Sequence, residues 1–94
     1  DGEVKNVEVI GKGKNLLIKC DTNSKGNSSI ELLYSLEILD TKEKLTGILG
    51  YTARTGNETI SLAVSLKNNL KGKRGIFKIY DKDGKVYFKK DVKF

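Results

Sequence analysis

The stretch IELLYSLEI, residues 30–38, places an apolar residue at every second position. Because the side chains of a β-strand point alternately to its two faces, this spacing predicts a strand with one apolar face and one mostly polar face. The apolar face comprises Ile30, Leu32, Tyr34, Leu36 and Ile38. Residues 60–67 repeat the pattern, and no segment shows the 3.6-residue period of an amphipathic helix. The chain is therefore predicted to consist of β-strands.

Five further strands with noisier alternation are predicted around these two, at 3–10, 15–21, 44–53, 75–80 and 85–93. Clusters of Gly, Asn, Asp and Ser, which favour turns, separate them at 11–13, 23–27, 40–43, 55–57, 68–73 and 81–84. Seven short strands predict one domain over residues 1–94, an all-β, seven-stranded antiparallel sandwich of immunoglobulin-like type. A small barrel is the competing architecture. Gly47 and Gly50 predict a bulge or a strand that changes sheets.

The chain contains one cysteine and no histidine. A structural zinc site needs about four Cys, His or acidic ligands, and a serine-protease type of triad needs a histidine. One cysteine cannot form an internal disulfide, and Cys20, which alternates with Leu16 and Ile18, is predicted to point inward as a small apolar side chain. Glu31 and Glu37, roughly 20 Å apart along one strand, are too distant for a glycosidase pair. We therefore expect a sandwich without a disulfide, no catalytic residue, no metal site, no cofactor and no enzyme activity.

The uninterrupted apolar runs of the chain are two or three residues long, whereas a membrane-spanning helix needs about 20 apolar residues. We therefore expect no membrane span. The chain begins at Asp1 rather than at Met, which suggests a piece of a larger protein whose neighbouring domains are its partners.

Positive charge is concentrated near the C-terminus. The chain has 18 basic and 12 acidic residues, and residues 66–94 hold ten basic and three acidic ones, a balance of +7. Six of these ten basic residues lie in the predicted hairpin, which consists of strands 75–80 and 85–93 and the turn between them. A two-residue turn at Asp83-Gly84 would set Lys78 opposite Lys89, and like charges in opposite positions are unfavourable.

A four-residue loop from Asp81 to Gly84 is therefore expected, because it keeps both faces of the hairpin consistent. The pairs that it predicts are Phe77–Phe88, Ile79–Val86, Lys78–Tyr87 and Tyr80–Lys85.

In this register the outer face of the hairpin alternates lysine with tyrosine. Lysine neutralises phosphate, sulfate or carboxylate groups, and tyrosine offers a stacking surface for sugars or bases. The candidate ligand-binding residues are Lys78, Tyr80, Lys85, Tyr87 and Lys89, with Lys73 and Arg74 in the preceding turn. The competing interpretation is a solvated face whose lysines deter edge-to-edge aggregation. The 16 lysines against two arginines weaken a specific phosphate interpretation, because lysine lacks the bidentate fork.

The loop Asp81-Lys82-Asp83-Gly84 is similar to part of a calcium-binding loop, because closely spaced carboxylates can share one hard cation. No glutamate follows at the spacing that an EF-hand loop requires. Asp and Gly are also ordinary turn residues, so we interpret the loop as a turn.

Three stretches carry a resemblance to a known family: YSLEILDTKEKL (34–45), GYTARTGNETISLAVSL (50–66) and GIFKIYDKDGKV (75–86). They resemble the accessory β-sandwich modules of bacterial surface and glycan-handling proteins, particularly those with a triple-tyrosine pattern. Tyr34 and Tyr51 occupy the first two tyrosine positions, and Phe77 occupies the third. The resemblance implies an extracellular or cell-surface, non-catalytic module appended to a larger bacterial protein.

These observations predict a non-catalytic accessory or structural module of a larger extracellular bacterial protein, with an anionic glycan or wall polymer as the candidate ligand. The alternative is a protein–protein interaction or assembly module that uses a strand edge or a sheet face. No recognised motif supports nucleic-acid binding, so no nucleic-acid partner is expected.

Overall fold

The computed structural model describes residues 2–24, 26 and 28–94, which form seven antiparallel strands in two sheets. The first sheet contains, in spatial order, β1 (Gly2–Lys12), β2 (Asn15–Ser24) and β5 (Gly56–Ser65). The second contains β4 (Lys44–Tyr51), β3 (Glu31–Ile38), β6 (Arg74–Tyr80) and β7 (Val86–Lys93).

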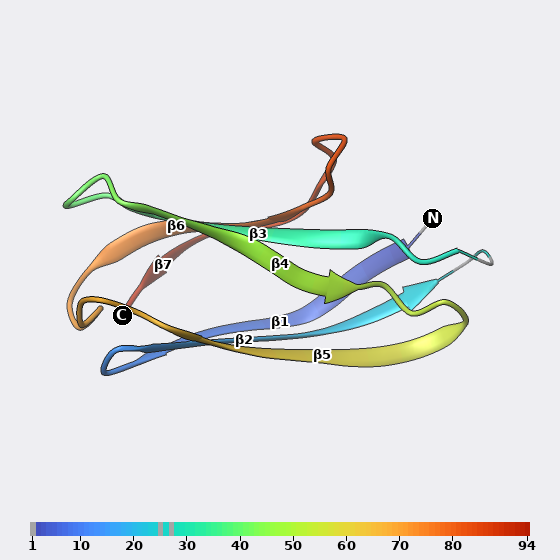
Figure 1. The fold of residues 1–94 in the computed structure, drawn as a ribbon, viewed down its shortest axis with the longest axis horizontal. Helices are drawn as coiled ribbons and strands as arrows, with labels where there is room; N and C mark the ends of the chain where they lie inside the picture. Colours follow the sequence, from blue (N-terminus) through green and yellow to red (C-terminus); the bar gives the residue numbers. More distant parts are fainter. Residues whose placement is uncertain (1, 25, 27) are drawn as a thin grey trace.

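The two sheets lie face to face as separate layers (Figure 1), and β1, β5, β4 and β7 are their edges. The predicted all-β fold of seven antiparallel strands is confirmed, and the two-sheet arrangement excludes the closed barrel. Cys20 is a free cysteine. Asp1, Lys25 and Asn27 lie outside the described residues, and the turn predicted at 23–27 is therefore described only in part.

The core lies between the sheets and consists of the alternate side chains that the sequence predicts. Its buried apolar members include Leu16, Ile18 and Cys20 of β2, Leu32, Tyr34, Leu36 and Ile38 of β3, and Phe77 and Ile79 of β6. These three strands hold the inner positions of their sheets, so their inward side chains are covered on all sides. The edge strands add partly buried side chains around this centre, among them Val9, Leu45, Leu62 and Phe88.

The bulge predicted near Gly47 and Gly50 is present. The pairing of β3 with β4 shifts between Leu32 and Leu33, while β4 stays in the second sheet along its whole length. Gly47 lies against the ring of Tyr34, where an added Cβ would come within 2.9 Å of a ring carbon. A side chain at this position would therefore displace the buried tyrosine.

The register predicted for the β6–β7 hairpin is wrong. The observed pairs are Phe77–Lys90, Lys78–Lys89, Ile79–Phe88 and Tyr80–Val86, in place of the predicted Phe77–Phe88, Ile79–Val86, Lys78–Tyr87 and Tyr80–Lys85. The observed register thus contains the Lys78–Lys89 pair that the sequence argument disfavoured.

The loop geometry explains this difference. The backbone N–H of Asp81 donates to the carbonyl of Lys85 at 3.0 Å, which leaves a three-residue loop that ends in Gly84 with φ of 89°. A three-residue hairpin loop needs a residue with positive φ at that place, and glycine adopts it without steric cost. Tyr87 then forms an unpaired bulge. The tighter loop and the bulge each shift β7 by one residue, so Val86 faces outward and Tyr87 leaves the outer face.

We expect Leu36→Ala to destabilise the protein by about 2–5 kcal/mol, because Leu36 is fully buried and its loss leaves a cavity. The measurement is urea unfolding followed by circular dichroism. The matched control is Leu17→Ala on the outer face of β2, where the side chain is 36% exposed, and we expect a cost of about 0.5 kcal/mol or less there. Equal costs for the two variants would contradict the assignment of the inner face of β3.

Candidate functional site

The outer face of β6 and β7 carries two rungs of opposed cations. Lys78 lies opposite Lys89, and Arg74 lies opposite Lys93. The two rungs are four residues apart along β6, or roughly 13 Å at ~3.3 Å per residue. Like charges directly opposite each other destabilise a sheet, so this face retains repulsion that the fold does not need.

Carboxylates separate the two rungs. Between them, Ile76 pairs with Asp91 on β7 and with Glu37 on β3, which places a negative charge on each side of it, and Glu37 pairs in turn with Lys44 on β4. The rung of Lys78 and Lys89 continues across the sheet through Ser35 and Thr46 and contains no carboxylate. The row of Lys78 and Lys89 therefore holds two opposed cations and no carboxylate, whereas Asp91, two residues from Lys89 on β7, lies in the neighbouring row.

Tyr80 completes this part of the surface. It is half-buried on the outer face, one rung beyond Lys78, and the Nζ of Lys78 lies 5.0 Å from the centre of its ring. This distance is within the range of a cation–π contact. The structure thus brings together three of the predicted site residues, namely Lys78, Tyr80 and Lys89.

Tyr87 and Lys85 belong to the hairpin tip rather than to that face, which corrects the predicted alternation. Tyr87 packs against the edge of the core, and its hydroxyl donates to the Asp81 carboxylate at 3.0 Å. The Nζ of Lys85 lies 5.0 Å from the centre of the Tyr87 ring. Figure 1 shows that this tip extends away from the body of the second sheet.

Asp81 organises the tip. Its Oδ1 accepts the backbone N–H groups of Asp83 at 2.9 Å and Lys85 at 3.0 Å. Burial by itself would raise the pKa of Asp81, but the hydrogen bonds from Lys85, Tyr87 and Asp83 outweigh it and hold the pKa below its ordinary value. Both carboxylate oxygens are therefore engaged in shaping the turn, which confirms the interpretation of residues 81–84 as a turn.

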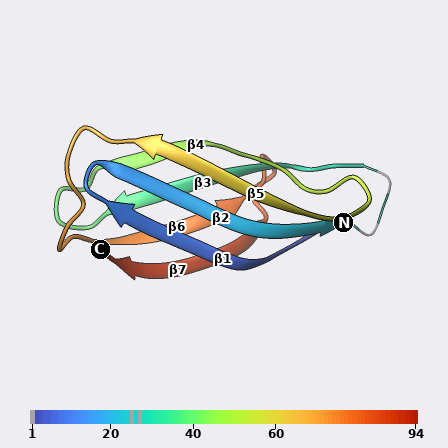
Figure 2. The same ribbon diagram turned by 90° about the horizontal axis from the view of Figure 1, so that it is seen from below.

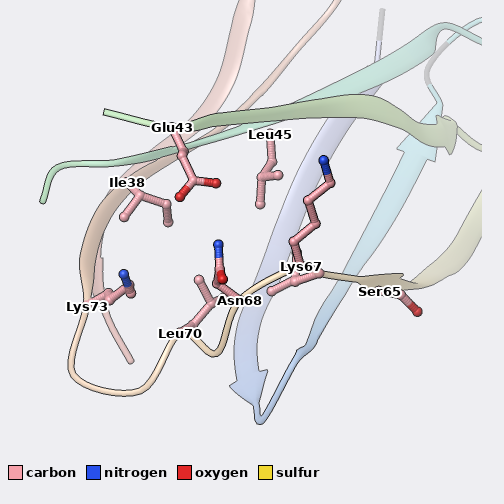
Figure 3. Close-up of a pocket in the computed structure, with 9 residues that line it drawn as sticks. Ile38, Glu43, Leu45, Ser65, Lys67, Asn68, Leu70 and Lys73 are labelled. Carbon is pink, nitrogen blue, oxygen red and sulfur yellow. The ribbon is translucent and has the colours of Figure 1, made fainter. Parts of the chain in front are cut away.

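Lys73 lies in a groove that the sequence argument missed. The groove has a volume of about 290 Å³ and lies at one end of the sandwich (Figure 3). Its lining residues are Ile38, Glu43, Leu45, Ser65, Leu66, Lys67, Asn68, Leu70 and Lys73. The floor is apolar and the rim is charged, so this groove suits an apolar group that carries a charged end.

The groove forms where the β5–β6 connection crosses from the first sheet to the second. The N–H of Leu66 donates to the carbonyl of Lys14 at 2.7 Å, and the N–H of Lys73 donates to the carbonyl of Leu70 at 2.9 Å. Figure 3 shows the Glu43 carboxylate and the Lys67 ammonium group extending into the groove from opposite sides. The sequence held one clue to this groove, the apolar Leu70 within the predicted turn at 68–73. In the structure the Leu70 side chain is only 4% exposed, which is unusual for a turn residue.

Cys20 is buried in the core, 1% exposed, as predicted from its alternation with Leu16 and Ile18. Burial, together with the neighbouring charge of Asp21, raises the pKa of the Cys20 thiol to about 11. The thiol is thus held in its protonated form, which is a poor nucleophile.

Within the described part of the chain, no three His, Cys, Asp or Glu side chains cluster closely enough to hold a metal ion. Over the same residues, no helix has the length and apolar character needed to cross a membrane.

No family model matches the chain, and no curated protein sequence matches it. Among solved structures, eight chains match. One is the solution structure of a "putative late embryogenesis abundant (LEA) protein", which is 13% identical, with a TM-score of 0.49 over 100% of this chain and 70% of that chain. A similarity at this level carries no argument about function.

We expect Cys20 of the native protein to react with iodoacetamide roughly 100-fold more slowly than in urea at pH 8, because a pKa raised by about two units lowers the thiolate fraction about that much. Burial adds a steric barrier. Since Cys20 is the sole cysteine, the measured rate reports on one site.

The same shift has a consequence for stability. Above the ordinary thiol pKa the unfolded chain binds fewer protons than the folded one, so the free energy of unfolding should fall as the pH rises toward 11. Cys20→Ala should reduce this fall, as measured by urea unfolding between about pH 8 and about pH 10.5.

For the alkylation experiment, equal rates of reaction with iodoacetamide in buffer and in urea would show that the Cys20 thiol is not buried.

Proposed function

We propose that the chain is a non-catalytic accessory or structural module of a larger extracellular bacterial protein, with an immunoglobulin-like sandwich. The order of the strands supports this assignment. The first, second and fifth strands form one sheet, and the third, sixth and seventh are neighbours in the other. This is how strands A, B and E and strands C, F and G divide in an immunoglobulin domain. The fourth strand extends the second sheet beside the third. The resemblance to bacterial triple-tyrosine modules supports the cell-surface location.

The ligand in this proposal is an anionic glycan or wall polymer, held by Lys78, Lys89 and Tyr80. The observation that carries it is the Lys78–Lys89 rung, in which two cations lie opposite each other and no carboxylate shares the row across four strands. A carboxylate, sulfate or phosphate group placed between the two ammonium groups would turn repulsion into attraction. Tyr80, one rung away, offers a face on which a sugar ring can stack.

The geometry narrows the residue set predicted from the sequence. Lys85 and Tyr87 lie at the hairpin tip, and Lys73 lies in the groove. Arg74 is separated from the proposed contact by the rung that Asp91 and Glu37 flank. The proposed contact is therefore smaller than the predicted patch.

A second candidate function is a protein–protein assembly module. The observation that favours it is β5, a ten-residue strand at the edge of the first sheet. Added strands can pair with such an edge through backbone hydrogen bonds.

We expect the double variant Lys78→Glu/Lys89→Glu to bind a uronic-acid polymer at least roughly tenfold more weakly than the unmodified chain, measured by isothermal titration calorimetry in low salt. Binding by the unmodified chain should weaken steeply between about 50 mM and about 200 mM salt, as expected when ion pairs with a polyanion carry the affinity.

Two controls test the location. Lys12→Glu/Lys14→Glu makes the same change in net charge at the β1–β2 turn, where both lysines are exposed, and should leave the affinity within about twofold. Lys85→Glu should have an equally small effect because Lys85 lies at the hairpin tip. If the control pair weakens binding as much as the test pair, the polymer responds to net charge and the proposed contact is wrong.

A further inference from the structure

The four edge strands of the sandwich differ in how they are protected against pairing with another chain. The pairing of β1 is broken by a bulge between Lys5 and Glu8, and that of β4 by a bulge at the level of Leu32 and Leu33. β7 has a bulge at Tyr87 and carries several lysines. Bulges and edge lysines are the usual means of preventing the addition of a further strand.

β5 has none of these protections. Its ten residues, GNETISLAVS, pair with β2 in unbroken register from Ser65 to Gly56, without a bulge. They contain one charged residue, Glu58, and no lysine, arginine or proline. β5 lies at the margin of the first sheet (Figure 2), so roughly half of its backbone N–H and C=O groups point away from β2.

The side chains of β5 are complementary to a second, antiparallel copy of the same strand. If a two-fold axis passes at Leu62, the opposed residues share a face, as antiparallel pairing requires. Leu62 then meets Leu62 of the second copy, and Ile60 meets Val64. These three side chains are partly buried neighbours of the core and would lose further exposure to water. On the outer face Ser61 meets Ala63, and no like charges are opposed.

The same register places the single charge of β5 beside charges of opposite sign. Glu58 falls opposite Leu66 of the second copy, a residue that lines the groove. The rim of that groove carries Lys67 and Lys73 against one carboxylate, Glu43 (Figure 3). With Glu58 of the other copy added, the rim of the groove would carry two positive charges, Lys67 and Lys73, and two negative ones, Glu43 and Glu58. The two-fold axis repeats this contact at the other end of the interface.

We propose that two copies of this chain associate through β5, antiparallel about a two-fold axis at Leu62, into a continuous six-stranded sheet in which Glu58 of each copy binds at the Lys67 and Lys73 side of the other copy's groove. The inference deepens the assembly candidate by naming its partner, and it is independent of the polymer contact on β6 and β7. Strand addition supplies the affinity, and the Glu58 contact fixes the register.

Sedimentation velocity of the 94-residue chain over a range of concentrations tests the proposal. The expected result is a reversible monomer–dimer equilibrium. Glu58→Lys should raise the dissociation constant by roughly tenfold or more, because it places a third ammonium group beside Lys67 and Lys73. Adding Lys67→Glu to this variant should restore most of the affinity. Asp83→Lys makes the same change in net charge at the exposed β6–β7 turn and should leave the dissociation constant unchanged.

A second variant tests the backbone pairing. Ser61→Lys/Ala63→Lys sets two ammonium groups opposite each other on both sides of the axis, and both positions are exposed in the isolated chain, so the fold should survive. This variant should be monomeric, with a circular dichroism spectrum like that of the unmodified chain.

The proposal is overturned if the unmodified chain stays monomeric at every concentration. It is also overturned if the dimer persists in the Ser61→Lys/Ala63→Lys variant, or if Asp83→Lys weakens the dimer as much as Glu58→Lys does. Failure of polymer binding with an intact dimer would remove the first candidate function alone.

Discussion

The burial of alternate side chains on β3 is the interaction on which the rest of the structure depends. Leu32 and Leu36 are fully buried, and they share one core with Leu16 and Ile18 of β2 in the facing sheet. A slip of one residue would expose this whole apolar face to water, so the register of β3 is fixed. Because β3 pairs with β4 on one side and β6 on the other, the registers of these two strands are fixed with it. The outward positions of the second sheet follow from this register. Lys78 therefore faces solvent because Phe77 and Ile79 do not.

The strands could be predicted from the sequence where apolar and polar residues alternate regularly. The first and last residues of a strand could not be predicted where polar residues extend it beyond the apolar positions. β5 begins at Gly56, before the apolar positions that identify it, because polar residues from Asn57 to Thr59 pair with β2 without contributing to the core. The alternation of β1 is noisy for a different reason. Asn6 has φ of 53° within a bulge, which changes the spacing of inward positions between Val4 and Val7. A bulge leaves no sign in the sequence beyond such a break in phase.

The candidate site was predicted in part. Lys78, Tyr80 and Lys89 lie together on the outer face because they follow the alternation of their strands. Tyr87 departs from it because the Asp81 carboxylate, which accepts two backbone N–H groups of the loop, also binds its hydroxyl. These local hydrogen bonds outweigh the repulsion between Lys78 and Lys89. The register predicted from the sequence was wrong because it was chosen to avoid that repulsion. The groove could not be predicted, because its lining comes from β3, the β3–β4 turn, β4, the end of β5 and the β5–β6 connection, which meet only through the packing of the two sheets.

We propose two separate interaction surfaces, the Lys78–Lys89 face of the second sheet and the β5 edge of the first. Mapping amide chemical shifts of the labelled chain by nuclear magnetic resonance tests this most directly, first on dilution and then with a uronic-acid polymer. Dilution is expected to change the shifts of β5 and of the groove around Lys67, whereas the polymer is expected to change those around Lys78, Tyr80 and Lys89. Shift changes in one common set of residues under both conditions would contradict it.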